Sequence, residues 1–315
     1  MRNFSIAIHG GAGTILKEQM TTELEASYLN GLQSALESGY NVLKNGGSAL
    51  NAVEIAVANL EDNILFNAGR GSVFNSNGLH EMDAAIMDGK TLGAGAVAGV
   101  KNIANPVKLA MLVMQKSEHV LLCGQGATDF ALTHNLQLEN DEYFFSQLRY
   151  DQWQSVRNSD DFILDHNDQS NKNSLQDKKF GTVGAVALDQ SGNIAAATST
   201  GGMTNKKFGR IGDSPLIGCG TYANNKTCAI SCTGHGEPFI KAIAAYDVSC
   251  LMEYKGMSLK QAMNEVVNVK LIKLQGEGGM IGIDRHGNSA MVFNSEGMYR
   301  ASNNSDNKME IAIFK

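Results

Sequence analysis

The chain has little proline, with three residues in 315, a single tryptophan, and no long apolar run. A membrane-spanning helix needs about 18 or more consecutive apolar residues, so we expect no contact with a membrane. The first residues lack the apolar stretch and the small-residue cleavage site of a signal peptide, which predicts a cytoplasmic location. The net charge of −6 argues against nucleic-acid binding, because that function needs a basic patch.

Cysteine is also scarce. The five residues are odd in number and lie mostly inside apolar, strand-like runs: Cys123, Cys219, Cys228, Cys232 and Cys250. This pattern predicts buried free thiols in a reducing compartment rather than a disulfide framework. Glycine, by contrast, is abundant, with 34 residues. With so little proline, this predicts tight turns and close backbone approaches. A hydrophobic content of 43% supports a large core, in one large domain or two ordinary ones.

Apolar spacing predicts strands and paired helices in the first half of the chain. Ser48 can cap the second helix, and Pro106 suits the first position of the third. We expect strands at 4–8, 79–87, 92–100 and 120–123, and helices at 21–45, 48–62, 106–119 and 128–134.

The composition changes at about residue 151. From 151 to 180 the chain is rich in Asp, Asn, Gln, Ser and Lys and has neither helical nor strand periodicity. We interpret it as a mobile tether, the alternative being an ordinary surface loop.

The second half is predicted to be rich in strands. Residues 182–189 and 193–200 flank Gln190-Ser-Gly192, a three-residue hairpin loop that ends in glycine. This loop length places Thr182 directly opposite Thr200, with Cβ atoms roughly 5 Å apart. Further strands are expected at 219–223, 227–232, 280–284 and 288–294, and helices at 237–254 and 258–274. The pattern indicates an α+β fold with two stacked sheets covered by helices.

The step Gly181-Thr182 lies where the polar segment meets this hairpin. A threonine hydroxyl is a weak nucleophile inside a chain. At a chain start, the α-amine, with a pKa of about 8, can act as its base. Cleavage before Thr182 would therefore create a catalyst.

Glycines and polar residues cluster elsewhere in ways that suit the binding of a charged ligand. Arg210 and Asp213 are three residues apart in a predicted loop. Held close together, a guanidinium and a carboxylate can bind the carboxylate and the ammonium of a zwitterion. The alternative is a surface salt bridge.

These motifs resemble the plant-type L-asparaginase / isoaspartyl peptidase family over nearly the whole chain. The resemblance rests on His9-Gly-Gly-Ala-Gly13, Gly181-Thr-Val-Gly-Ala-Val186, Thr198-Ser-Thr-Gly-Gly-Met-Thr-Asn-Lys206, Gly209-Arg-Ile-Gly-Asp-Ser-Pro215 and Thr233-Gly-His-Gly-Glu237. It implies an N-terminal-nucleophile hydrolase with a four-layer αββα sandwich. It also implies cleavage into an α subunit, 1–181, and a β subunit, 182–315, which form one structural domain and associate as (αβ)₂.

The resemblance also implies roles for individual residues. Thr182 is the nucleophile, Thr200 orients it, Thr233 and Gly234 form the oxyanion hole, and Asn67 positions a water or the oxyanion. The substrate-binding residues are Arg210, Ile211, Gly212, Asp213, Thr233, Gly234, His235 and Gly236. The implied substrates are L-asparagine and β-aspartyl dipeptides, both hydrolysed to L-aspartate.

No cofactor is required by this chemistry. The segment from Leu60 to Arg70 resembles the family's structural sodium loop, in which backbone carbonyls hold the ion. The corresponding residues are Leu60, Glu61, Asn63, Phe66, Ala68 and Arg70.

Other functions fit the sequence less well. A serine hydrolase would need a Gly-x-Ser-x-Gly elbow, and a nucleotide-binding protein would need a phosphate-binding glycine fingerprint; neither occurs. A glycosylasparaginase-like amidase and an uncleaved, inactive scaffold remain as alternatives. His235 is interpreted as a loop side chain, because the N-terminal amine already supplies a base. His9 is interpreted as structural, because it lies at a glycine turn that ends a buried strand.

Overall fold

Strand β5 (Val183–Leu188), which follows the predicted nucleophile, is buried along its whole length. Its alternate residues enter two different cores: Val183 and Ala185 pack in one, and Val186 and Leu188 in the other. Successive side chains of a strand point to opposite faces, so this strand belongs to a sheet covered on both sides. The computed structural model describes residues 3–158 and 181–315 of the chain.

The described strands form two sheets. The larger has eight strands in the order β12-β11-β1-β5-β6-β2-β3-β4, and the smaller has four in the order β10-β9-β8-β7. The other strands of the larger sheet are β1 (Ser5–Gly13), β2 (Met82–Asp88), β3 (Ala94–Val100), β4 (Leu121–Cys123), β6 (Ile194–Thr200), β11 (Gly297–Asn304) and β12 (Glu310–Phe314). The smaller sheet contains β7 (Thr221–Ala223), β8 (Cys228–Gly234), β9 (Gly278–Asp284) and β10 (Ser289–Phe293).

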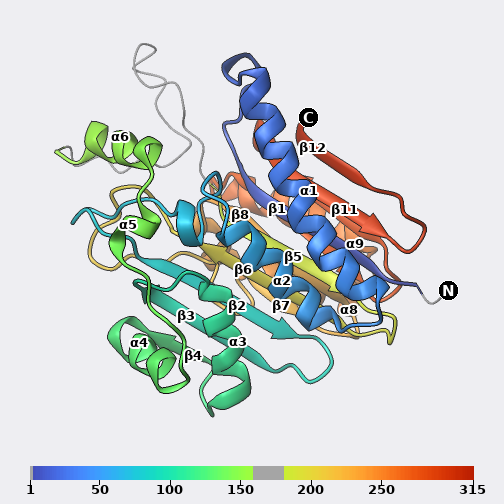
Figure 1. Ribbon diagram of the computed structural model, residues 1–315. Helices are drawn as coiled ribbons and strands as arrows, with labels where there is room; N and C mark the ends of the chain where they lie inside the picture. Colours follow the sequence, from blue (N-terminus) through green and yellow to red (C-terminus); the bar gives the residue numbers. More distant parts are fainter. Residues whose placement is uncertain (1–2, 159–180) are drawn as a thin grey trace.

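Three helices pack on one face of the larger sheet: α1 (Thr22–Lys44), α2 (Ala49–Glu61) and α3 (Pro106–Lys116). Figure 1 shows α1 and α2 lying across this sheet. Thr21 and Ser48 cap α1 and α2 by accepting backbone N–H groups through their side chains. Short elements complete this half: η1 (Lys17–Gln19), η2 (Gly69–Gly71), α4 (Gly124–Thr133), α5 (Asp141–Phe144) and α6 (Gln147–Val156).

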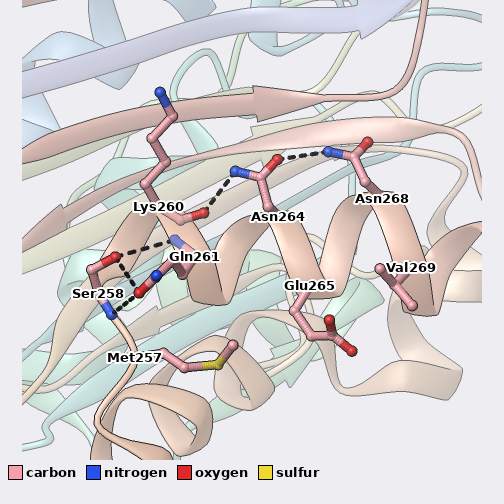
Figure 2. A pocket seen from close by; sticks show the side chains of 8 residues that line it. All are labelled: Met257, Ser258, Lys260, Gln261, Asn264, Glu265, Asn268 and Val269. Carbon is pink, nitrogen blue, oxygen red and sulfur yellow. Dashed lines mark hydrogen bonds between the residues drawn. The ribbon is translucent and has the colours of Figure 1, made fainter.

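The smaller sheet packs against β1, β5 and β6 of the larger one, and its outer side carries helices. These are α7 (Gly236–Ala242), α8 (Ala244–Lys255) and α9 (Leu259–Glu265), which continues as the π-helix η3 (Val266–Leu271). Figure 2 shows the start of α9, where Ser258 and Gln261 form a capping box. The surface pocket drawn there is lined by residues of the 257–269 segment, none of which belongs to the predicted site.

Most predicted elements are confirmed within a few residues, but the predicted extents of two segments are wrong. The helix expected at 237–254 is broken in two, because Ile243 adopts a left-handed conformation with φ 48°. The tether was expected to begin at about residue 151, whereas α6 extends to Val156. The rest of that segment, 159–180, lies outside the described residues.

Two further findings differ from expectation. Strands β11 and β12 were not predicted, although β11 pairs with β1 and lies next to the edge strand β12 of the larger sheet. All five cysteines are free, as expected, but only Cys228 and Cys232 are buried, and Cys123 is exposed. None of the helices in the described ranges is long and apolar enough to cross a membrane.

Candidate active site

The hairpin that carries Thr182 has the predicted register. Val183 lies opposite Ser199 on β6, so continuing the antiparallel ladder by one residue brings Thr182 opposite Thr200. Both threonines are almost fully buried. Ser214 Oγ donates a hydrogen bond to Thr182 Oγ1 over 3.5 Å, and Thr200 Oγ1 accepts the N–H of Gly202 at 2.9 Å.

A third strand extends this row of polar side chains. On β2, Asp83 lies directly opposite Thr200, and cross-strand partners share a face of the sheet. Asp83 is fully buried, accepts the N–H of Gly99 at 2.7 Å through one oxygen, and leaves the other without a hydrogen bond. Burial raises the pKa of its carboxyl group, while the nearby ammonium of Lys206 acts in the opposite direction.

Thr233 and Gly234 lie at the end of β8 and face the end of β1. Thr233 is fully buried, and its Oγ1 accepts the N–H of Ala12 at 3.2 Å. This contact brings the glycine-rich segment after His9 to the site. Gly234 has a φ of 141°, a conformation that favours glycine.

Asn67 is used to hold the backbone beside Thr200. Its amide nitrogen donates to the carbonyl of Gly202 at 2.8 Å, and its side-chain oxygen accepts the N–H of Val73 at 3.1 Å. Its own carbonyl accepts the N–H of Gly201 at 3.0 Å. The side-chain nitrogen and the backbone carbonyl of Asn67 therefore hold the turn that follows Thr200, while its side-chain oxygen holds Val73.

Arg210 has a partner that the sequence analysis did not identify. Its Nε and Nη2 atoms donate to the two carboxylate oxygens of Glu237, each at 2.8 Å. His235 Nε2 lies 3.1 Å from the same carboxylate. Burial acts to raise the pKa of Glu237, but the hydrogen bonds from His235 and Arg210 outweigh it and lower that pKa well below its usual range.

Arg210 and Asp213 nevertheless converge on one point. A Cβ on Gly236 would lie 3.0 Å from both Arg210 Nη2 and Asp213 Oδ1, so the two charged groups approach the backbone of Gly236 together. Asp213 is buried, and its Oδ2 has no hydrogen-bond partner. Burial raises the pKa of this carboxyl group to about 7, and Arg210 opposes the shift only in part. The group is an acceptor that a ligand ammonium can satisfy.

The remaining predicted residues differ in exposure. Gly212 is buried within the loop, whereas Ile211 is exposed. In the segment compared with a sodium loop, Leu60, Glu61, Phe66 and Ala68 are buried, Asn63 is half-buried and Arg70 is exposed. The Arg70 guanidinium lies over the ring of Tyr143, 5.5 Å from its centroid. No group of three or more His, Cys, Asp or Glu side chains in residues 3–158 and 181–315 could hold a metal ion.

The sequence analysis did not single out three residues that lie near the site: Glu237, Ser214 and Lys206. Each occurs inside a motif that the sequence analysis quoted, but no short-range spacing reveals its partner. Glu237 pairs with a residue 27 positions away, and Ser214 contacts one 32 positions away.

Comparison with known proteins identifies the family. The family model described as asparaginase matches residues 2–313. The chain is 53% identical to an isoaspartyl peptidase of Escherichia coli (strain K12), over 94% of this chain and 91% of that protein. It is 46% identical to a putative isoaspartyl peptidase/L-asparaginase of Dictyostelium discoideum, over 98% of both, and 42% identical to the isoaspartyl peptidase/L-asparaginase of Homo sapiens, over 93% of this chain and 91% of that protein. The chain therefore belongs to the asparaginase family.

Proposed function

We propose that this protein is an autocleaving amidohydrolase that releases L-aspartate from β-aspartyl dipeptides and from L-asparagine. The observation that carries the proposal is the convergence of Arg210 and Asp213 on Gly236, in a chain whose buried Thr182 lies opposite Thr200. The names of the curated relatives support the same two activities.

In the first step the chain would cut itself. Thr182 Oγ1 attacks the carbonyl carbon of Gly181, the C–N bond breaks, and the nitrogen takes the proton to become an α-amine. Water then hydrolyses the ester, leaving a carboxylate on Gly181 and a free N-terminal Thr182. Before this step the nitrogen is part of an amide and cannot act as a base, so the intact chain is inactive.

In the mature enzyme the α-amine of Thr182 takes the hydroxyl proton while the oxygen attacks the β-carbonyl of the substrate. Thr233 and the N–H of Gly234 stabilise the resulting oxyanion, the main electrostatic contribution in acyl transfer. The protonated amine then gives its proton to the leaving nitrogen, which departs as ammonia or as an amino acid. Water hydrolyses the β-aspartyl ester and releases aspartate.

Arg210, Asp213 and the carbonyl of Gly236 form a clamp, which selects the aspartyl group by the two charges that this group carries. Arg210 binds the α-carboxylate while Glu237 holds the guanidinium in a fixed orientation, because a bidentate pair sets both distance and plane. Asp213 and the carbonyl of Gly236 bind the α-ammonium. With both α-groups held, the β-carbonyl faces Thr182, and only the leaving group differs between asparagine and a β-aspartyl dipeptide.

The raised pKa of Asp213 predicts how substrate binding depends on pH. Its carboxyl group must be ionised to bind an ammonium, and burial raises its pKa to about 7. The KM for L-asparagine should therefore fall several-fold as the pH rises from about 6 to 8, because more of the free enzyme carries the charge. The measurement is KM and kcat across this range.

Asp213→Asn is the control. It should raise KM and remove its pH dependence, while the kcat profile keeps the titration of the Thr182 α-amine.

The ionisation of Asp213 should also affect the stability of the fold. The folded-state pKa lies above the unfolded value, so ionisation lowers the free energy of unfolding as the pH rises from about 4 to 7, and the variant should lose this slope. A KM profile unchanged in Asp213→Asn would contradict the assignment.

The resemblance extends to architecture and assembly. We propose a four-layer αββα sandwich, with residues 1–181 as the α subunit, 182–315 as the β subunit, one structural domain from both, and an (αβ)₂ assembly in the cytoplasm. The two cores on either side of the larger sheet support the layered arrangement, and the five free cysteines support a reducing compartment.

We propose that backbone carbonyls of the loop from Leu60 to Arg70 hold a sodium ion. Two carbonyl oxygens of this loop lie close to one point, since a Cβ on Gly71 would lie 2.0 Å from the Phe66 oxygen and 2.7 Å from that of Ile64. Converging carbonyl oxygens suit a hard cation. The ion would hold the loop that contains Asn67 and would take no part in the reaction.

We expect the apparent Tm to be higher in sodium chloride than in choline chloride at equal ionic strength, because an ion bound only by the folded state stabilises it. Equal values over a wide range of concentrations would contradict the sodium assignment.

A further inference from the structure

A continuous set of buried polar side chains lies between the two sheets beneath Thr182. It consists of His9 on β1, Ser231 on β8, Thr198 on β6, Thr221 on β7, and Ser214 in the loop before β7; we call it the hydroxyl chain. None of the five side chains is more than 1% exposed. The proposed reaction assigns no role to any of them.

Four of the contacts that connect the hydroxyl chain are 2.7–3.0 Å long, and the last, from Ser214 to Thr182, is 3.5 Å long. Nε2 of His9 lies 2.9 Å from Ser231 Oγ, which is hydrogen-bonded to Thr198 Oγ1 at 2.7 Å. Thr221 Oγ1 donates to Thr198 Oγ1 at 2.7 Å, and the same hydroxyl lies 3.0 Å from the carbonyl oxygen of Ser214. Ser214 then donates to Thr182 Oγ1. The connected groups therefore end at the predicted nucleophile.

Packing alone does not account for these side chains. Neighbouring core positions hold apolar residues such as Ala196 and Ile230, which fill space without a need for partners. A buried hydroxyl without a hydrogen bond is costly, and one broken contact would leave its neighbours unsatisfied. Each of the four hydroxyls has at least one hydrogen-bond partner, and a polar network bonded in this way favours one arrangement of its members.

His9 anchors the far end in its neutral form. Burial lowers its pKa to about 3, against a smaller opposing effect of the Thr182 backbone. The imidazole is therefore uncharged at neutral pH and serves as a hydrogen-bonding anchor rather than as a general base.

Gly184 keeps the space that this anchor needs. It lies on β5 directly opposite His9. A Cβ at this position would lie 2.0 Å from Ser231 Oγ and 2.5 Å from His9 Nε2. Any side chain here would break the His9–Ser231 contact. Gly184 is therefore needed for the hydroxyl chain to form.

We propose that the hydroxyl chain positions the nucleophile, with Thr198, Thr221 and Ser231 acting as positioning residues through Ser214. This inference rests on the proposed role of Thr182. Because Ser214 donates to Thr182 Oγ1, the threonine's own proton must point elsewhere, and in the mature enzyme the α-amine is available to accept it. The donor also stabilises the oxygen as that proton leaves.

The test uses Thr198→Val and Ser231→Ala, with Ser249→Ala as the matched control. Ser249 is as deeply buried and is hydrogen-bonded to Thr227 over the same 2.7 Å, but it belongs to α8. We expect kcat on L-asparagine to fall about 10–100-fold in both chain variants, with KM changed less than about two-fold, because misplacement of a reacting group slows the chemical step. Self-cleavage, which uses the same oxygen, should slow as well.

If the hydroxyl chain had only a structural role, all three variants would have a lower Tm and the same kcat as one another. That result would overturn the proposal. Thr198→Ser keeps the hydroxyl and should restore most of kcat; no recovery would also count against it. If Thr198→Val does not fold, Thr221→Val replaces it. A wild-type protein without cleavage and without activity would instead defeat the proposed function itself.

Discussion

Replacing Thr182 with alanine should leave the chain in one piece and abolish hydrolysis of L-asparagine. In the proposed mechanism the same atom, Thr182 Oγ1, attacks Gly181 and later the substrate, and the variant lacks it. Removing the nucleophile of a covalent mechanism typically lowers kcat by on the order of 10⁴–10⁶. Denaturing gels over several days and an ammonia-release assay provide the measurement.

Thr182→Ser is the matched control, because it keeps a hydroxyl at the same place. It should cleave and retain measurable activity. The buried site is small, and removal of a methyl group should leave the contact with Ser214 intact. If Thr182→Ala matured into two fragments, the cut would lie elsewhere and the nucleophile would be wrongly assigned.

Replacing Arg210 with alanine should damage substrate hydrolysis far more than self-cleavage. Cleavage of the precursor involves no free α-carboxylate, whereas every proposed substrate has one. Arg210 is half-buried and pairs with Glu237 through two hydrogen bonds. Truncating one partner of such a charge pair costs about 2–5 kcal/mol, so we expect kcat/KM to fall roughly 10²–10³-fold, mostly through KM. Steady-state kinetics and the rate of fragment formation measure the two effects separately.

Two companion variants sharpen this result. Arg210→Lys keeps the charge but loses the planar fork, so it should recover only part of the loss. Glu237→Gln weakens the hold on Arg210 without removing it and should raise KM less than Arg210→Ala does. Equal damage to cleavage and to hydrolysis in Arg210→Ala would contradict the clamp role.

The hairpin that holds Thr182 could be predicted from the sequence because its constraints are local. Gln190-Ser-Gly192 fixes the loop length, and the apolar run on each side fixes the strands, so the register with Val183 opposite Ser199 followed. The same reasoning failed at Ile243, where the apolar spacing continues through a left-handed residue. It also failed at β11, whose sequence ends in Ala301-Ser302-Asn303-Asn304 and lacks a strand pattern.

The partners within the site could not be predicted, because they join elements far apart in the chain. Arg210 was paired with Asp213 by spacing, but its bidentate partner is Glu237, at the start of α7. The residues of the hydroxyl chain come from four strands and a loop, and no single sequence motif contains them all. Only the packing of the smaller sheet against the larger one brings these groups within hydrogen-bonding distance.

The most direct test of the account is to follow cleavage and activity together in the purified protein. Mass spectrometry should find two fragments with the masses of residues 1–181 and 182–315, the second beginning at Thr182. The rate of L-asparagine hydrolysis should rise in proportion to the cleaved fraction. A full-length chain that already hydrolyses L-asparagine, or one that never cleaves and stays inactive, would contradict the central claim that cutting before Thr182 creates the catalyst.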